Sequence, residues 1–138
     1  MAKGLYTPQN PEKYIGDPRK IRYLSSWELK FQYFCDTNPN ILAWGSEEIY
    51  IKYFHPIKKK VCNYIPDFFI KYRDANGNVI TEIVEIKPKK ETKLTGKSSL
   101  YDKVNIAINT QKWTAAKAFC DKAGIKFRVL TEDQLFRK

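Results

Sequence analysis

The chain has 138 residues, with 25 Lys and Arg against 15 Asp and Glu, which gives a formal net charge of +10. This length predicts a single domain, and a composition that is 43% hydrophobic and 14% aromatic is sufficient for an apolar core. The basic balance favours a polyanionic partner over a basic one, unless the charge serves solubility alone. The sequence has no apolar run long enough for a membrane span and no apolar signal segment, so we expect no membrane contact.

The three Cys residues lie far apart in the sequence and form no Cys-x-x-Cys pair. Structural zinc sites use closely spaced cysteines, and disulfide frameworks use an even number of them. We therefore expect three reduced cysteines, with neither a zinc site nor a disulfide.

The N-terminal segment, residues 1–23, is rich in Pro, Gly and basic residues and has little periodicity. We expect it to form an arm in front of a domain that spans residues 24–138. Tyr6, Tyr14 and Tyr23 are its candidate packing anchors. The arm either contacts DNA or a partner, or wraps around the domain.

The first helix is predicted to start at Ser25 and to run to about Asp36, before Asn38-Pro39. Ser25 and Glu28 have the spacing of a capping box. The apolar stripe of this helix consists of Leu24, Trp27, Phe31, Phe34 and Cys35. Glu28 falls within the stripe, so it is either the partner of the cap or a carboxylate that points toward a metal.

Two short strands are predicted next, at residues 41–44 and 49–54, and the sequences His55-Pro56 and Lys-Lys-Lys at 58–60 interrupt them. His55 stands alone beside a proline. We therefore interpret it as a turn or surface residue and not as a catalytic base.

A hairpin follows, with strands at residues 65–72 and 79–87 joined by the Asn-Gly turn at 76–77. Asn-Gly between apolar runs is a strong signal for a tight turn. The strands are apolar on both faces, which is typical of covered central strands.

A second long helix is predicted over residues 99–123, with Ser99 as its N-cap and Gly124 after its end. Its expected stripe consists of Tyr101, Val104, Ile108, Gln111, Ala115, Ala118 and Phe119. Residues 125–129 alternate as in a strand, and Thr131 starts a short final helix with a capping box.

This order of elements predicts an α/β or α+β fold, a single-domain mixed β-sheet flanked by helices. The strand after the long helix is expected to lie parallel to the second hairpin strand, through a right-handed crossover.

Asp67, Glu85 and Lys87 are the most informative residues of the sequence. Alternation along a strand places Glu85 and Lys87 on one face, and two carboxylates from neighbouring strands are suitable ligands for Mg²⁺. A lysine beside them can orient a water or stabilise charge on a phosphate, which suits metal-dependent cleavage of a phosphodiester. The alternative is a solvated charge pattern, although charge between apolar neighbours is costly unless it serves a site.

Four lysines follow this group in the segment after Pro88: Lys89, Lys90, Lys93 and Lys97. A DNA backbone that lies across this segment would release counterions. The alternative is a solvated loop. We name double-stranded DNA as the expected partner.

A Pro-Asp pair at residues 66–67 and Glu-Ile-Lys at 85–87, preceded by Glu28 on a helix, resemble the PD-(D/E)XK nuclease superfamily. The strings SSWE and QKWTAAKAFCDKAGIKFRVLTE resemble its phage resolvase and transposon-end endonuclease branches. Over almost the whole chain, NPEKYIGDPRKIRYLSSWELKF, TNPNILAWGSEEI and YIPDFFI resemble the head-completion proteins of T-even-like tailed phages.

The resemblance implies a restriction-endonuclease-like fold and a metal-dependent DNA endonuclease, with Mg²⁺ as the cofactor and Mn²⁺ as a substitute. It assigns Asp67 and Glu85 as metal ligands and Lys87 as the catalytic lysine. Glu28 becomes a further acidic ligand or a residue that positions water.

The resemblance also implies a task at the end of DNA packaging, where the protein acts on packaged DNA ends before the tail attaches. Gln111 or Lys112 would add a contact to DNA from the long helix. Portal or neck proteins would be partners, and the protein would occur in the head–neck region of the virion and in the host cytoplasm.

Two alternatives remain. The first is a structural DNA-end binder or adaptor at the portal, whose catalytic site is idle. The second is a branched-DNA resolvase or another phage endonuclease, such as one that restricts host DNA. The complete set of Asp67, Glu85 and Lys87 favours catalysis.

Overall fold

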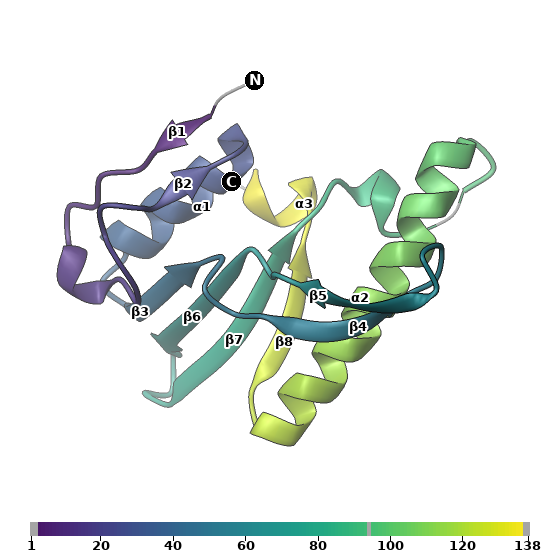
Figure 1. Ribbon diagram of the computed structural model, residues 1–138. Coiled ribbons are helices and arrows are strands. Elements are labelled where there is room, and N and C mark those ends of the chain that lie inside the picture. Colours follow the sequence, from purple (N-terminus) through teal and green to yellow (C-terminus); the bar gives the residue numbers. More distant parts are fainter. Residues whose placement is uncertain (1–2, 94, 137–138) are drawn as a thin grey trace.

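The computed structural model of the chain describes residues 3–93 and 95–136. Its centre is a four-stranded sheet in the order β3 (Ile41–Ser46), β6 (Phe68–Arg73), β7 (Val79–Ile86) and β8 (Lys126–Leu130) (Figure 1). The neighbours β3 and β6 and the neighbours β6 and β7 are antiparallel, whereas β8 runs parallel to β7. The predicted mixed sheet and the predicted parallel pairing are thus confirmed.

Two helices, α1 (Ser26–Thr37) and α2 (Leu100–Ala123), cover opposite faces of this sheet. Val84 packs in the core on the α1 side, and its neighbour Ile83 packs in the core on the α2 side. The short helix α3 (Glu132–Leu135) follows β8 and contacts α1. None of the described helices is long and apolar enough to span a membrane.

The helix ends follow the sequence signals. Ser25 Oγ accepts a hydrogen bond of 3.2 Å from the backbone N–H of Glu28 at the start of α1, and Ser99 Oγ accepts one of 3.1 Å from Asp102 at the start of α2. Gly124 ends α2 in the left-handed conformation, with φ of +73°.

The predicted Asn-Gly hairpin is present between β6 and β7. Gly77 has φ of +81°, and Asp74 Oδ1 accepts hydrogen bonds of 2.9 Å from the backbone N–H groups of Asn76 and Asn78. The turn thereby fixes the register in which the two strands pair.

A separate two-stranded sheet, formed by β4 (Ile51–His55) and β5 (Lys60–Tyr64), lies against α2 (Figure 1). β5 was not predicted, and the hairpin strand expected from residue 65 begins at Phe68. The lysines at 58–60 do not end an element. They lie at the tip of a hairpin, where Lys59 has φ of +56° and long charged side chains reach solvent.

The predicted apolar stripe of α2 is correct in part, since Ile108 and Ala115 pack against the core on this side of the sheet. The buried residues of this helix are Asn109, Ala116 and Cys120. Tyr101 is 74% exposed, Phe119 is 42% exposed, and Gln111 is also exposed. The true inner side is harder to recognise because it includes a polar residue: Asn109 Nδ2 donates a hydrogen bond to the backbone O of Glu91 at 3.3 Å.

The stripe of α1 is correct in part. Phe31 and Cys35 are buried as expected, but Phe34 is 46% exposed. The polar residues Gln32 and Asp36 are buried on the same helix, because residues of the N-terminal segment fold over it.

The N-terminal segment packs on the sheet side that carries α1. β1 (Gly4–Leu5) pairs with β2 (Arg22–Tyr23). The 3-10 helix η1 (Pro11–Lys13) belongs to the segment of chain that connects these two strands. Tyr14 and Ile21 are buried in the core on the α1 side.

Asp36 binds this segment to α1. Its carboxylate accepts hydrogen bonds from the Tyr6 hydroxyl at 2.6 Å and from the backbone N–H groups of Gln9 and Asn10 at 2.7 and 2.9 Å. Burial alone would raise the pKa of Asp36, but these bonds and the charge of Lys13 outweigh it, and the pKa lies below its usual value.

We expect Asp36→Asn to lower the free energy of unfolding by about 2–4 kcal/mol at neutral pH, because bonds to a charged acceptor are lost. The folded pKa is depressed, so this stabilisation is present above the unfolded pKa of about 4 and disappears as the pH falls through the folded value. Urea unfolding at neutral and acidic pH measures both effects. Asp17→Asn is the control, because the partly exposed Asp17 pairs with the exposed Arg19 at the surface. Equal stability of the two variants would contradict the role of Asp36.

Candidate metal centre

Asp67 and Glu85 lie side by side at one end of the sheet. Phe68 pairs with Val84 across β6 and β7, so Asp67, just before β6, lies opposite Glu85 of β7. The backbone N–H of Asp67 donates to Glu85 Oε1 at 3.0 Å, and the backbone N–H of Ile86 donates to Asp67 Oδ2 at 2.8 Å. Each carboxylate is thus fixed through one oxygen, which leaves the second oxygen for a cation.

Glu85 is buried and Asp67 is partly buried, with little compensating charge beside them. Burial, and then the charge of Glu85, raises the pKa of Asp67 well above its usual value. Burial also raises the pKa of Glu85, although the charge of Lys87 opposes this effect. A bound cation would relieve the repulsion, so the residues present fit a metal.

The donors are oxygen atoms, which suit a hard divalent cation such as Mg²⁺. Among the described residues, no group of three or more His, Cys, Asp or Glu side chains is placed to hold a metal. A pair of carboxylates is nevertheless a common Mg²⁺ site in nucleotide-processing enzymes, because water and substrate phosphate complete the coordination.

Lys87 is the third member of the group. Strand alternation places it on the same face as Glu85, and its charge lowers the pKa of both Glu85 and Asp67. Its backbone N–H donates to the backbone O of Leu130 at 3.0 Å, which fixes the position of Lys87 at the end of β7. The structure therefore brings Asp67, Glu85 and Lys87 together.

Glu28 lies in the first turn of α1. Its Oε1 accepts from the backbone N–H of Leu24 at 3.4 Å, and its Oε2 accepts from the Ser25 hydroxyl at 3.3 Å. Its charge nevertheless contributes to the raised pKa of Asp67. Glu28 thus contacts the N-cap residue Ser25 of α1 and lies within electrostatic range of Asp67.

Lys112 approaches the same carboxylates from α2. Its Nζ lies 5.6 Å from the ring centre of Tyr64 and 5.8 Å from that of Tyr53. Burial and the charge of Lys87 lower the pKa of Lys112, whereas Glu85 and Asp67 oppose this effect. Its neighbour Gln111 is exposed, so of this predicted pair only Lys112 faces the site.

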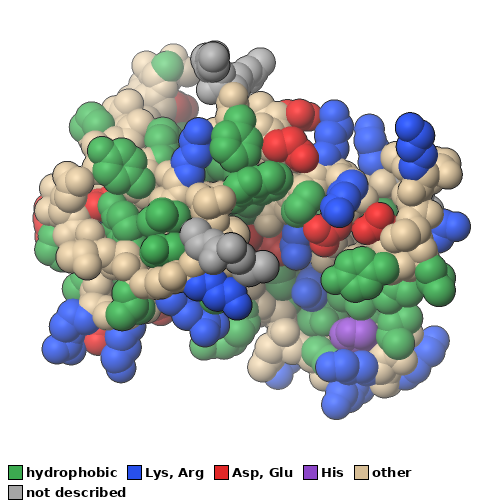
Figure 2. All heavy atoms as spheres, turned by 90° about the horizontal axis from the view of Figure 1, so that it is seen from above, with side chains coloured by type: hydrophobic (Ala, Val, Ile, Leu, Met, Phe, Trp, Pro, Cys, Tyr) green, Lys and Arg blue, Asp and Glu red, His purple; other side chains and the backbone are tan. Residues whose placement is uncertain are grey.

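The four candidate DNA-binding lysines lie on and after the 3-10 helix η2 (Lys89–Glu91), and all are exposed. Lys89 Nζ forms an ion pair of 3.0 Å with Asp133 Oδ2. Figure 2, seen from the end of the sheet where β7 ends, shows basic side chains around acidic ones over this surface. The arrangement can attract a phosphate backbone toward the carboxylate pair.

Tyr53 and Tyr64 were not identified from the sequence as part of the site. The buried hydroxyl of Tyr64 lies near Glu85, whose charge adds to the effect of burial in raising the pKa of Tyr64. This hydroxyl has no hydrogen bond of ordinary geometry within residues 3–93 and 95–136. Burial alternates along β4 but not along β5, so no local pattern of the sequence marks both tyrosines as part of the site.

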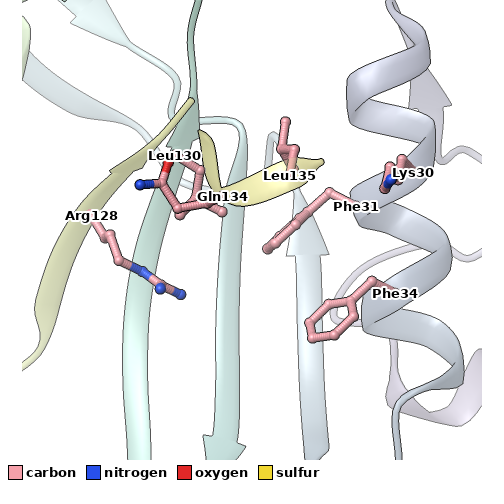
Figure 3. Close-up of a pocket in the computed structure, with 7 residues that line it drawn as sticks. All are labelled: Lys30, Phe31, Phe34, Arg128, Leu130, Gln134 and Leu135. Atoms are coloured by element: carbon pink, nitrogen blue, oxygen red, sulfur yellow. The ribbon is translucent and has the colours of Figure 1, made fainter. Parts of the chain in front are cut away.

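A different hollow of about 220 Å³ lies on the α1 side of the sheet (Figure 3). It is lined by Lys30, Phe31, Phe34, Arg128, Leu130, Gln134 and Leu135. None of the candidate catalytic or DNA-binding residues lines it, so it is separate from the metal centre.

Two comparisons with known proteins agree with this geometry. The family described as TnsA-like endonuclease N terminal matches residues 38–132, which include Asp67, Glu85 and Lys87. The chain is also similar to the "Head completion nuclease" of Enterobacteria phage T4, with 42% identity over 142 residues that cover 96% of this chain and 92% of that protein. The predicted relationship to the PD-(D/E)XK nucleases and the predicted endonuclease activity are confirmed, and the chain belongs to the TnsA-like endonuclease N-terminal family.

Proposed function

We propose that this endonuclease cleaves double-stranded DNA with Mg²⁺ at the Asp67–Glu85 pair, and that Mn²⁺ can substitute. The observation that carries the proposal is the pair of backbone hydrogen bonds that holds the buried Glu85 and the partly buried Asp67 side by side and leaves one oxygen of each for the ion. An unpaired charge in such a position is costly unless a ligand compensates it.

The residues around the pair would divide the remaining work. Lys87 would orient the attacking water and stabilise the negative charge that develops on the phosphate. Lys112, held over two tyrosine rings, would contact a phosphate oxygen of the bound strand. A bound Mg²⁺ supplies Lewis acidity, which neutralises phosphate charge and makes a nearby water more acidic.

Glu28 would serve as a residue that positions water at the edge of the centre, while it keeps its role in the cap of α1. Lys89, Lys90, Lys93 and Lys97 would contact the DNA backbone beside the cleaved bond. Lys89 contributes least in this scheme, because Asp133 already neutralises it.

We further propose that the biological substrate is the end of packaged phage DNA, before the tail joins the head. The support is the T4 relative, which is named for head completion and shares 42% identity over 96% of this chain. The protein would then act in the head–neck region, with portal or neck proteins as partners, and would occur in the host cytoplasm before assembly.

We expect Mg²⁺ to raise the melting temperature of the wild-type protein, because the ion binds the folded state. Asp67→Asn and Glu85→Gln should lose this increase and should cleave DNA about 10²–10³ times more slowly. Lys87→Ala should lose activity to a similar extent but keep the increase. The exposed Asp121→Asn is the control. Full activity of Asp67→Asn on linear, nicked or branched DNA would contradict the proposed metal site.

Substitutions of Lys112 and its neighbour Gln111 test the proposed contact between α2 and a phosphate of the DNA. We expect Lys112→Gln to reduce cleavage about tenfold or more, because a charge-assisted contact to phosphate is lost. Gln111→Ala should leave cleavage unchanged, since neighbouring side chains on a helix point about 100° apart and Lys112 is the one that lies near the carboxylates. Single-turnover kinetics of both variants measure the difference, and equal rates would remove Lys112 from the site.

A complementation experiment separates catalysis from a purely structural role in head completion. Heads from a phage that lacks this protein would be supplied with Asp67→Asn protein that folds and binds DNA. If catalysis is required, these heads should remain defective in tail attachment and their DNA ends should remain untrimmed. Restored infectivity would instead favour the adaptor role, because this substitution changes one charge and almost no volume.

A further inference from the structure

The sheet formed by β4 and β5, hereafter the β4–β5 ribbon, has two unlike faces. Its inner face contains Ile51, Tyr53 and Tyr64, which are buried against α2. On its outer face, Phe54 is 50% exposed and Val61 is 63% exposed, and these two residues lie directly opposite each other. An exposed aliphatic–aromatic pair on a ribbon is a surface that a ligand can cover.

The tip of the β4–β5 ribbon is basic and internally braced. His55 Nδ1 accepts hydrogen bonds from the backbone N–H groups of Ile57 at 3.2 Å and Lys58 at 3.1 Å. The backbone N–H of Lys59 donates to the backbone O of His55 at 2.9 Å. The tip lysines, residues 58–60, are therefore presented from an ordered turn.

No acidic residue accompanies these lysines. Residues 49–66 contain four Lys, one His and neither Asp nor Glu. None of the four lysines forms an ion pair in the part of the chain that the structure describes. Their charge is left uncompensated, which suits a polyanion more than any other class of partner.

One end of the β4–β5 ribbon lies at the metal centre, and the tip lysines lie at the other end. Tyr64, its last residue, lies near Glu85, and Asp67 follows it closely in the chain. Four residue steps separate Tyr64 from Lys60, a distance of about 13 Å along a strand. This reach is similar to the width of the DNA major groove, about 12 Å.

We propose that the β4–β5 ribbon is a second contact surface for duplex DNA, in which the tip lysines bind phosphates across one groove from the cleaved bond. Phe54 and Val61 pack against sugars or base edges between these two contacts. The inference rests on the proposed function, because it takes duplex DNA as the substrate. Such a contact gives a role to a ribbon that packs on α2, ends at the metal centre and has a basic tip and an apolar outer face.

The test compares two triple substitutions that remove the same charge. Lys58, Lys59 and Lys60 are changed to Gln in one variant. In the control, the exposed residues Lys71, Lys122 and Lys126 are changed to Gln. They lie on β6, in the last turn of α2 and on β8, respectively, and not on the ribbon. Binding of a short linear duplex is measured over a range of salt concentrations, and Mg²⁺-dependent cleavage of the same duplex is measured in parallel.

We expect the slope of log affinity against log salt to become less steep by about 2–3 in the ribbon variant, since each lysine that meets a phosphate contributes about 0.9. The control variant should keep a slope close to that of the wild type. A ribbon variant with the slope of the control overturns the inference, and an acidic protein surface would then be the better occupant.

A second pair of variants tests the apolar outer face. Phe54→Ala should weaken duplex binding about fivefold without changing the salt slope, because apolar contact and not charge is removed. Phe119→Ala, on an exposed part of α2, is the matched control and should have no effect. Equal affinities for these two variants would contradict the apolar contact.

The parallel cleavage measurement distinguishes failure of this inference from failure of the proposed function. A wild-type protein that neither binds nor cleaves the duplex would overturn both. A wild-type protein that cleaves the duplex, together with a ribbon variant that equals the control, would overturn only the role of the ribbon.

Discussion

The metal centre of this molecule depends on two carboxylates, one buried and one partly buried, that are held together at the end of two neighbouring strands. The backbone of each strand donates a hydrogen bond to the carboxylate of the other, so the register of β6 and β7 and the position of the acids are the same constraint. A shift of the register by one residue would turn every side chain of a strand to the opposite face. The Asn-Gly turn and Asp74 therefore fix the metal centre as well as the hairpin.

The rest of the fold supports this pair from both sides of the sheet. α1 covers one face and brings Glu28 within electrostatic range of Asp67, while the N-terminal segment is bound to α1 through Asp36. On the other face, α2 and the β4–β5 ribbon place Lys112 over Tyr53 and Tyr64. Lys87 at the end of β7 and Lys112 on α2 thus place positive charge near the carboxylates. A site that cleaves phosphodiesters requires such charge.

Local patterns predicted those elements whose signals are complete within a few residues. Ser25, Ser99 and Gly124 marked helix ends correctly, and the capping box of Thr131 and Gln134 is present. The pattern failed where burial depends on a distant partner. Tyr101 and Phe119 were expected to be buried, yet both are exposed. β5 was missed because the three lysines at 58–60, where it begins, resemble a loop. Only pairing with β4 and packing on α2 make that segment a strand.

The sequence by itself determined the hairpin and the group of Asp67, Glu85 and Lys87, because strand alternation and a turn with Gly in the left-handed conformation are local properties of the chain. The order of the elements determined the mixed sheet. It left Glu28 open between a cap and a site, and it named Gln111 and Lys112 without a choice between them. The tertiary structure decided that Lys112 faces the carboxylates and Gln111 faces solvent, since the rotation of α2 is set by its packing on β4 and β8. It also decided that Tyr53 and Tyr64 border the centre, because the contact joins residues from separate parts of the chain and no local pattern encodes it.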